Sequence, residues 1–218
     1  MTMPAETIRV LVVDDDPLTR QAVITILGGD PLIAVTGQAS DGAEAWSLIS
    51  DLAPDVVLMD IRMPRMDGLD ALRRIRRDQP QLPVVMLTTF SDHDLVEQAL
   101  TEGAAGFLLK TSAPEELSRA VRSAHHGGLV MSPTVTRWVV DSWVAHRSPE
   151  IADRSRVSAL SPRQHDVLQA LADGDSNADI GRRLHLSEGT VKGYVSEIIA
   201  ALGVRNRVEA AVVAHKAG

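Results

Sequence analysis

Acidic, hydroxyl and amine side chains follow short apolar runs at four places in the first 110 residues of the chain. In chain order they are Asp14, Asp15 and Asp16, then Asp60, then Thr88, and finally Lys110. Carboxylates about 4 Å apart repel each other by about 1 kcal/mol in water and about 4 kcal/mol at an intermediate dielectric, so a cluster of them needs a cation. Mg²⁺ is the natural choice, because it prefers oxygen ligands and is satisfied by one or two carboxylates, water and phosphate. An ammonium and a hydroxyl could contact phosphate oxygens, so we expect phosphoryl transfer onto an aspartate.

Five apolar runs of strand length alternate with amphipathic, helix-like stretches between residues 8 and 126. The runs are Ile8–Val13, Ile33–Val35, Val56–Met59, Val84–Leu87 and Gly106–Leu109. This alternation predicts an α/β fold, a five-stranded doubly wound parallel sheet with helices on both faces. Ligands of such a sheet bind beyond the carboxyl ends of its strands. We therefore expect the acids, the threonine and the lysine to lie on one rim of the sheet.

The alternation stops at residue 127, and the chain changes character twice after that point. We predict a linker over residues 127–157, with a short helix marked by Val135, Val139 and Val140 and a polar tether at its end. Residues 158–218 follow as a small all-α domain, whereas residues 1–126 form the α/β domain. Ser161, with a proline after it and Gln164 three positions on, has the pattern of a helix N-cap with a capping box.

The charge, the cysteine count and the apolar runs disfavour several classes of protein. The net charge is −7, while residues 158–218 contain seven basic and seven acidic side chains, which argues against a non-specific nucleic-acid coat protein. There is no cysteine, which excludes disulfides and thiolate metal sites and fits a reducing compartment. No apolar run approaches the roughly 20 residues that a membrane helix needs. The first residues lack the basic start of a signal peptide, so we expect a cytoplasmic protein with no membrane partner.

Four segments of the first region, VLVVDDDP, VVLMDIRMPRMDGLDAL, VVMLTTF and GFLLK, resemble the signatures of the bacterial response-regulator receiver domain. The resemblance covers residues 8–126. It implies that Asp60 is the phosphoacceptor and that a sensor histidine kinase is the phosphoryl donor. It also implies that Mg²⁺ is bound by Asp15, Asp60 and the backbone carbonyl of Arg62, with Asp14 acting through water.

The same resemblance implies a switch beside the phosphoacceptor. Thr88 would be its hydroxyl, Lys110 the amine that pairs with phosphate, and Phe107 the aromatic ring that moves with it. One alternative is a magnesium phosphatase of the haloacid-dehalogenase type, but that chemistry needs a second carboxylate where this chain has Arg62. We therefore do not expect an enzyme. The other alternative is a regulator of the same fold that works without phosphorylation, under the control of a partner or ligand.

The last region contains a helical pattern long enough to lie in a DNA groove. Residues 188–202 would form a helix of about 22 Å, which fits a major groove. Val191, Val195, Ile198 and Leu202 share one face of that helix and should be buried. With the shorter helix before it, this pattern predicts a helix-turn-helix whose second helix reads DNA. A helical bundle that binds protein instead of DNA is the alternative.

Four segments of this region, LSPRQHDVL, NADIGRRL, LSEGTVKGYV and LGVRNR, resemble the LuxR-type DNA-binding domain. Together with the receiver signatures, they identify the chain as a member of the NarL/FixJ subfamily. The resemblance implies a phosphorylation-dependent transcriptional regulator. Such a protein forms a homodimer on phosphorylation, binds double-stranded promoter DNA and acts together with RNA polymerase.

The second helix of this motif offers few side chains for direct base contacts, each bidentate contact being worth about 1–3 kcal/mol. The residues expected to face DNA are Gly189, Thr190, Lys192, Gly193, Tyr194 and Ser196. Phosphate contacts are expected from Lys192, Arg182, Arg183, Arg205 and Arg207. One domain should therefore bind weakly, through phosphate contacts and DNA shape, and useful affinity should need two copies on an operator with two half-sites.

Overall fold

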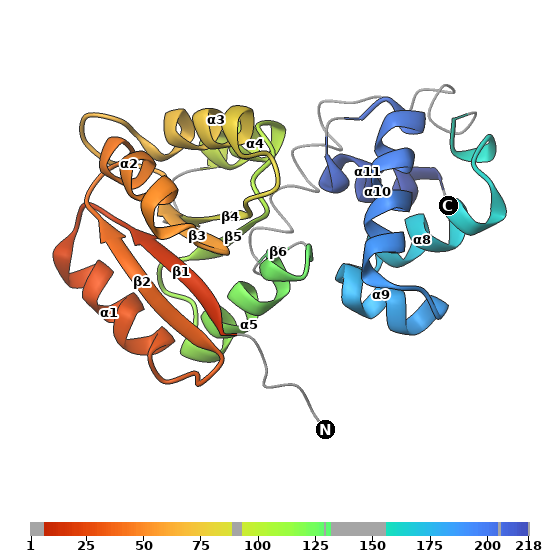
Figure 1. Ribbon diagram of the computed structural model, residues 1–218. Helices are drawn as coiled ribbons and strands as arrows, with labels where there is room; N and C mark the ends of the chain where they lie inside the picture. Colours follow the sequence, from red (N-terminus) through yellow and green to blue (C-terminus); the bar gives the residue numbers. More distant parts are fainter. Residues whose placement is uncertain (1–6, 89–92, 129, 132–155, 205, 218) are drawn as a thin grey trace. The chain divides into compact units, whose positions relative to one another are not determined.

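The computed structural model describes residues 7–88, 93–128, 130–131, 156–204 and 206–217, which fall into two compact units (Figure 1). The first unit is built of strands and helices, and the second is helical. The expected linker helix around Val135–Val140 and most of the expected tether lie outside the described residues. None of the helices in the described part of the chain combines the length and apolarity that crossing a lipid bilayer requires.

A parallel sheet forms the centre of the first unit. Its strands are β1 (Ile8–Val13), β2 (Ile33–Ala39), β3 (Val56–Asp60), β4 (Val84–Thr88), β5 (Gly106–Leu109) and β6 (Val130–Met131). The spatial order is β2-β1-β3-β4-β5-β6, and every neighbouring pair is parallel. Because the order runs outward in both directions from β1, the crossovers place helices on both faces of the sheet.

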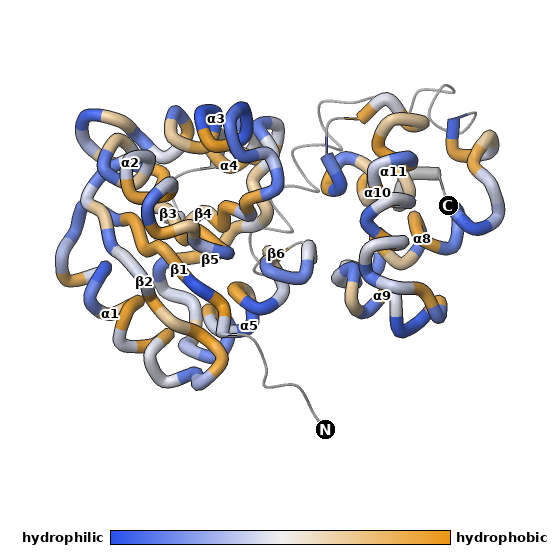
Figure 2. Tube along the Cα trace, viewed as in Figure 1, coloured by the Kyte–Doolittle hydropathy of each residue, from blue (hydrophilic) through white to orange (hydrophobic). Residues whose placement is uncertain are grey.

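Five helices cover the two faces of the sheet (Figure 1). They are α1 (Pro17–Leu27), α2 (Gly42–Leu52), α3 (Gly68–Asp78), α4 (His93–Thr101) and α5 (Pro114–His125). Helices α1 and α5 pack on one face, where Leu27 and Val121 join Val12, Leu58 and Leu87 in one buried cluster. Figure 2 shows the central strands as almost continuously hydrophobic, as expected for strands buried on both faces.

The sheet has six strands, so the expectation of five was wrong by one edge strand. Strand β6 is only two residues long, and its Val130 and Met131 pair with Gly106 and Phe107 of β5. A Cβ at Gly106 would lie 2.3 Å from the Val130 carbonyl oxygen, so the glycine permits this close pairing. A segment of two residues has no periodicity to detect, which is why the pattern of apolar residues did not indicate it.

A glycine brings the start of α3 against the end of β3. The backbone N–H of Gly68 donates to the Ile61 carbonyl at 2.9 Å. A Cβ at this position would lie only 2.1 Å from the backbone oxygen of Asp60. The loop that carries residues 61–67 can therefore close directly above Asp60 only because Gly68 has no side chain.

The second unit contains four helices in its described part: α8 (Pro162–Ala172), α9 (Asn177–Leu184), α10 (Glu188–Leu202) and α11 (Arg207–Ala217). Ser161 and Gln164 form the expected capping box at the start of α8. Val191, Val195, Ile198 and Leu202 of α10 are buried, as their spacing predicted. A tight turn joins α9 to α10, since a Cβ at Gly181 would lie 2.7 Å from the Leu186 carbonyl oxygen.

We expect Gly68→Ala to destabilise the first unit by about 1–3 kcal/mol, because the new methyl group has to push α3 away from β3. Urea unfolding followed by circular dichroism measures this change. Gly29→Ala is the matched control, since its Cβ would meet its nearest neighbour, the Ile26 carbonyl oxygen, at 3.3 Å. Equal unfolding midpoints for the two variants would contradict the close approach.

Candidate functional site

Three carboxylates meet at the carboxyl ends of β1 and β3. Asp14 and Asp15 follow β1 directly, and Asp60 is the last residue of β3. The two strands are parallel neighbours, so their ends lie side by side. One carboxylate oxygen from each residue lies within 4.8 Å of the other two, and Asp14 and Asp60 are buried whereas Asp15 is exposed. The structure thus brings together three of the four acids that the sequence placed on one rim.

An ammonium group lies between the two buried acids. Lys110 Nζ is 2.8 Å from Asp14 Oδ2 and 2.9 Å from Asp60 Oδ2. The strand register explains this position: Asp60 pairs with Leu87, and Leu87 pairs with Leu108, two residues before Lys110. Side chains two residues apart in a strand point to the same face, so Lys110 and Asp60 converge.

The electrostatics of this cluster follow from burial and from an excess of negative charge. Burial and the nearby Asp14 raise the pKa of Asp60 above 3.8, while the Lys110 ammonium and the Arg62 backbone N–H oppose the rise. Burial lowers the pKa of Lys110, but its hydrogen bonds to Asp14 and Asp60 outweigh that effect and leave the pKa raised above 10.5. Lys110 is therefore an ammonium, and one positive charge faces three carboxylates.

The residues of the cluster fit a magnesium ion. All three side chains offer oxygen atoms, the ligands that Mg²⁺ prefers. Asp14 Oδ2 is buried, and the Lys110 ammonium lies 2.8 Å from it. A divalent cation would offset the negative charge that Lys110 leaves uncompensated.

The two expected switch residues lie deep in the sheet. Thr88 ends β4, Phe107 belongs to β5, and both are buried. Because Thr88 pairs with Leu109, two residues beyond Phe107, the two side chains lie on the same face of the sheet. Their roles as switch residues remain predictions.

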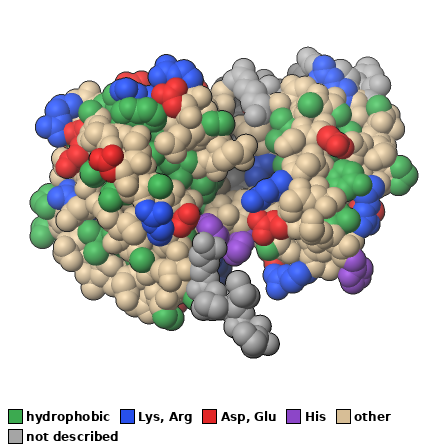
Figure 3. All heavy atoms as spheres, in the orientation of Figure 1, with side chains coloured by type: hydrophobic (Ala, Val, Ile, Leu, Met, Phe, Trp, Pro, Cys, Tyr) green, Lys and Arg blue, Asp and Glu red, His purple; other side chains and the backbone are tan. Residues whose placement is uncertain are grey.

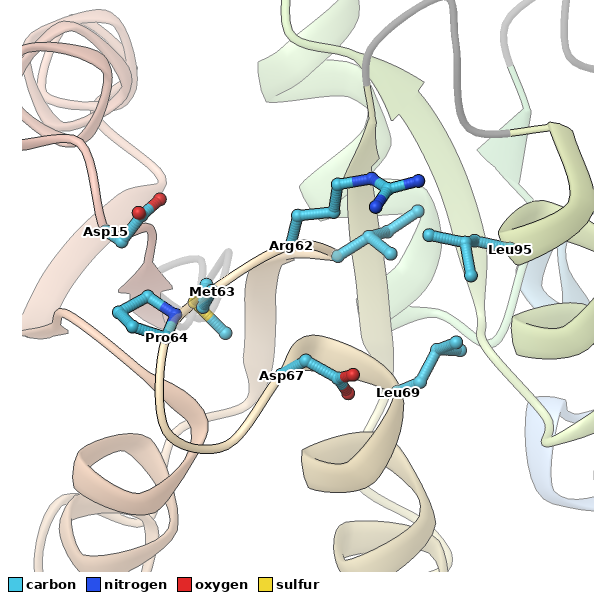
Figure 4. Close-up of a pocket in the computed structure, with 8 residues that line it drawn as sticks. Asp15, Arg62, Met63, Pro64, Asp67, Leu69 and Leu95 are labelled. Atoms are coloured by element: carbon cyan, nitrogen blue, oxygen red, sulfur yellow. The ribbon is translucent and has the colours of Figure 1, made fainter.

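A pocket of about 440 Å³ opens beside the exposed acid of the cluster. Figure 4 shows Asp15 across this space from the loop that joins β3 to α3, with Arg62 and Leu95 on the far side. Met63 and Leu69 line the pocket and are largely buried. The pocket leaves room for a ligand next to Asp15.

Two neighbouring features were not found from the sequence. Asp16 caps α1, accepting hydrogen bonds from the backbone N–H groups of Leu18 and Thr19, so it has a local structural role. The end of β2 also contributes a buried acid, Asp41, which pairs with Arg65 of the loop after β3. An acid followed by glycine, two positions after a strand, was the available signal for Asp41.

In the second unit, the residues expected to face DNA lie on the surface of α10. Gly189, Thr190, Lys192, Gly193 and Ser196 are exposed, and Tyr194 is half-buried. A Cβ at Gly193 would meet no atom within 4 Å, so packing within this unit does not require glycine there. This surface is therefore open to a close partner.

Three of the basic side chains expected to contact phosphate are paired with nearby acids. Arg182 pairs with Asp179, Arg183 lies 2.8 Å from Asp173 and 3.0 Å from Asp175, and Lys192 lies 3.3 Å from Glu188. Figure 3 shows acidic and basic side chains interspersed on the visible face of this unit, with no large patch of one sign. A DNA phosphate therefore has to compete with these carboxylates for the basic side chains.

Arg207 has a different environment from the other expected phosphate contacts. Its guanidinium donates to the Asp175 carbonyl at 2.8 Å and to Asn177 Oδ1 at 3.4 Å. Burial lowers its pKa to about 10. The structure argues against the expected phosphate contact, because Arg207 holds α11 to the segment before α9. Arg205 lies outside the described residues.

Comparison with known proteins covers both units. A model of the response regulator receiver domain matches residues 10–122, and a model of bacterial regulatory proteins of the luxR family matches residues 158–214. The transcriptional regulatory protein LnrK of Bacillus subtilis is 36% identical over 215 residues, which cover 97% of this chain and 98% of LnrK. The nitrate/nitrite response regulator NarL of Escherichia coli is 36% identical over 207 residues, 95% of this chain and 94% of NarL. The solved structure of ChrA, a response regulator of a heme-sensing two-component system, aligns with a TM-score of 0.55 and 33% identity over 96% of this chain and 97% of ChrA.

These matches confirm the resemblance seen in the sequence motifs, and they extend over nearly the whole chain. The fold of the first unit and the helix-turn-helix of the second are the ones that the two family models describe. The chain belongs to the response-regulator family, as a transcriptional regulator with a receiver domain followed by a LuxR-type DNA-binding domain.

Proposed function

We propose that Asp60 accepts a phosphoryl group from a sensor histidine kinase. The observation that supports this most strongly is the Lys110 ammonium, 2.9 Å from Asp60 and 2.8 Å from Asp14. An Asp60 carboxylate oxygen attacks the phosphorus atom, and the bond from phosphorus to the histidine nitrogen breaks, so the imidazole leaves with the electron pair. After the transfer, the Lys110 ammonium pairs with phosphoryl oxygens, which replace part of its contact with the carboxylates.

Mg²⁺, when bound, offsets the charge that builds up on the phosphoryl oxygens. Asp15, Asp60 and the backbone carbonyl of Arg62 would hold the ion, and Asp14 would do so through water. The Arg62 backbone N–H donates to the Asp60 carboxylate, which orients the acceptor oxygen before transfer. The exposed Asp15 lies at the open side of the cluster, next to the pocket.

Phosphorylation then changes the surface of the receiver. It adds nearly two negative charges at Asp60. Thr88 would follow the new phosphoryl oxygens, and Phe107 would move on the same face of the sheet. The altered surface favours a homodimer, in which the second DNA-binding domain acts at a raised effective concentration.

In the second unit, α10 would enter the major groove of promoter DNA in the cytoplasm, where RNA polymerase works. Its small exposed residues, such as Gly193, allow the DNA backbone close, while Lys192, Arg182 and Arg183 contact phosphates. Since these bases are already paired with acids, each contact gives less than a free base would. A single domain therefore binds weakly, and the dimer provides the affinity.

We expect the wild-type chain to incorporate radiolabel from a small phosphodonor with Mg²⁺, and Asp60→Asn to incorporate none. Chelation of Mg²⁺ should abolish the labelling of the wild type as well. Asp16→Asn is the control, because Asp16 is an exposed helix cap outside the cluster. A wild type that takes up no label would instead favour a regulator of this fold that works without phosphorylation.

The raised pKa of Asp60 predicts a specific dependence of stability on pH. Between 3.8 and the raised value, the folded state holds a proton that the unfolded state has lost, so the free energy of unfolding falls as the pH rises. We therefore expect Asp60→Asn to be more stable than the wild type near neutral pH, with the difference shrinking toward acid pH. Urea unfolding without divalent cations, between about pH 4 and pH 8, measures this effect.

Asp51→Asn makes the same substitution at an exposed site on α2 and controls for the change of side chain. An Asp60→Asn variant that is less stable than the wild type at neutral pH would contradict the prediction that burial of the charged Asp60 carboxylate destabilises the folded state.

Lys192→Ala should weaken DNA binding across all sequences and lower the slope of log affinity against log salt by about 1. Glu188→Gln should strengthen DNA binding and increase this slope, because it removes the carboxylate that lies 3.3 Å from Lys192. Fluorescence anisotropy with promoter fragments at several salt concentrations measures both. Arg207→Gln is the contrast, expected to lower thermal stability without this change of slope. Unchanged binding in the first two variants would favour a protein-binding bundle.

A further inference from the structure

Arg65 adopts a backbone conformation that is unusual for a residue in the middle of a loop. Three non-glycine residues in the described ranges have a positive φ angle: Ala53, Arg65 and His185. Ala53 and His185 are the C-caps of α2 and α9, where the left-handed conformation is common. Arg65, with φ of 65°, lies in the loop between β3 and α3. A long side chain disfavours this conformation, so other contacts have to stabilise it.

The side chain of Arg65 supplies those contacts. Its guanidinium forms an ion pair with Asp41 and donates to Ser40 Oγ at 3.3 Å. The Asp41 side chain is only 2% exposed, whereas that of Arg65 is 68% exposed. Exposed ion pairs contribute little, but removing the partner of a buried carboxylate leaves that charge uncompensated.

Asp41 is itself fixed at the start of α2. Its Oδ1 atom accepts hydrogen bonds from the backbone N–H groups of Ala43 at 2.7 Å and Glu44 at 2.9 Å. Glu44 Oε2 in turn accepts hydrogen bonds from the backbone N–H and the hydroxyl of Ser40, both at 2.7 Å. Both partners of the guanidinium are therefore anchored to the first turn of α2, and they form a rigid receptor for it.

A backbone contact joins the same two segments. The N–H of Gly42 donates to the Met66 carbonyl at 3.0 Å, and a Cβ at Gly42 would lie 2.9 Å from Met66 Cγ. The tip of the loop, Arg65 and Met66, is thus clamped to α2. Its base is closed by the hydrogen bond from Gly68 to Ile61.

Arg62 lies between the clamped tip and the closed base of this loop (Figure 4). Its backbone N–H donates to the Asp60 carboxylate, and its carbonyl is the backbone ligand in the proposed Mg²⁺ site. With both ends held, the Arg62 peptide has little freedom to rotate. Groups that orient a metal ligand typically change metal affinity by about 10–100-fold when they are removed.

We propose that the Arg65–Asp41 ion pair is a positioning element that sets the Mg²⁺ affinity and the phosphorylation rate of the receiver by fixing the Arg62 peptide. The inference rests on the proposed function of Asp60. It assigns a role at the phosphorylation site to the end of β2, although neither Arg65 nor Asp41 touches the reacting atoms.

The test compares the full-length wild type with Arg65→Gly, which tolerates the positive φ angle but removes the ion pair. We expect Mg²⁺, titrated calorimetrically, to bind Arg65→Gly about tenfold more weakly, and labelling by a small phosphodonor at subsaturating Mg²⁺ to slow in proportion. Arg65→Lys keeps the charge and should recover most of the affinity. Asp41→Asn, which keeps an oxygen for the helix cap, should weaken binding as Arg65→Gly does, and the double variant should be no weaker than either one.

Arg77→Gln is the matched control, since it removes an exposed guanidinium that pairs with its neighbour Asp78 on α3. Hydrogen exchange of residues 61–67, measured without any metal, should be faster in Arg65→Gly than in the control. Equal Mg²⁺ affinities in the wild type, Arg65→Gly and Asp41→Asn would overturn the inference and leave the proposed function intact. Absence of Mg²⁺ binding and labelling in the wild type itself would overturn both.

Discussion

The contact between one ammonium and two buried carboxylates is the interaction on which the receiver depends. Lys110 holds Asp14 and Asp60 together at the ends of β1 and β3, and the parallel register of four strands brings all three groups to that point. Three carboxylates and one ammonium leave the cluster short of positive charge. This shortage of positive charge favours the binding of a divalent cation. It also means that the orientation of nearby backbone dipoles affects how tightly the cation binds.

In the DNA-binding unit, in contrast, the numbers of basic and acidic side chains are balanced. Arg182, Arg183 and Lys192 are paired with acids within the unit, so the phosphate contacts proposed for one copy are expected to be weak. The exposed surface of α10 is dominated by small and uncharged side chains such as Gly193 and Ser196. A DNA-binding domain with low affinity as a single copy is well suited to control by dimerisation. Linking a second copy raises the overall affinity for DNA although each copy keeps the same contacts.

Much of this could be predicted from the sequence, because the relevant signals are local and periodic. The rim residues follow apolar strands, and the stripe from Val191 to Leu202 has helical spacing, so both were predicted correctly. Strand β6 was missed because two residues carry no period, and charge alone does not reveal that Asp175 and Asn177 bind Arg207. The clamp between Arg65 and Asp41 joins segments 24 positions apart, and the pairing of β2 and β3 with the two sides of β1 brings them together.

The most direct test of the central claim is a crystal structure of the chain with Mg²⁺ and beryllofluoride, a stable substitute for the phosphoryl group. We predict beryllium bonded to an Asp60 carboxylate oxygen, Lys110 Nζ paired with a fluoride, and Mg²⁺ bound by Asp15, Asp60 and the Arg62 carbonyl. Beryllofluoride absent from Asp60 at saturating concentration, or an ion held by other residues, would contradict the account.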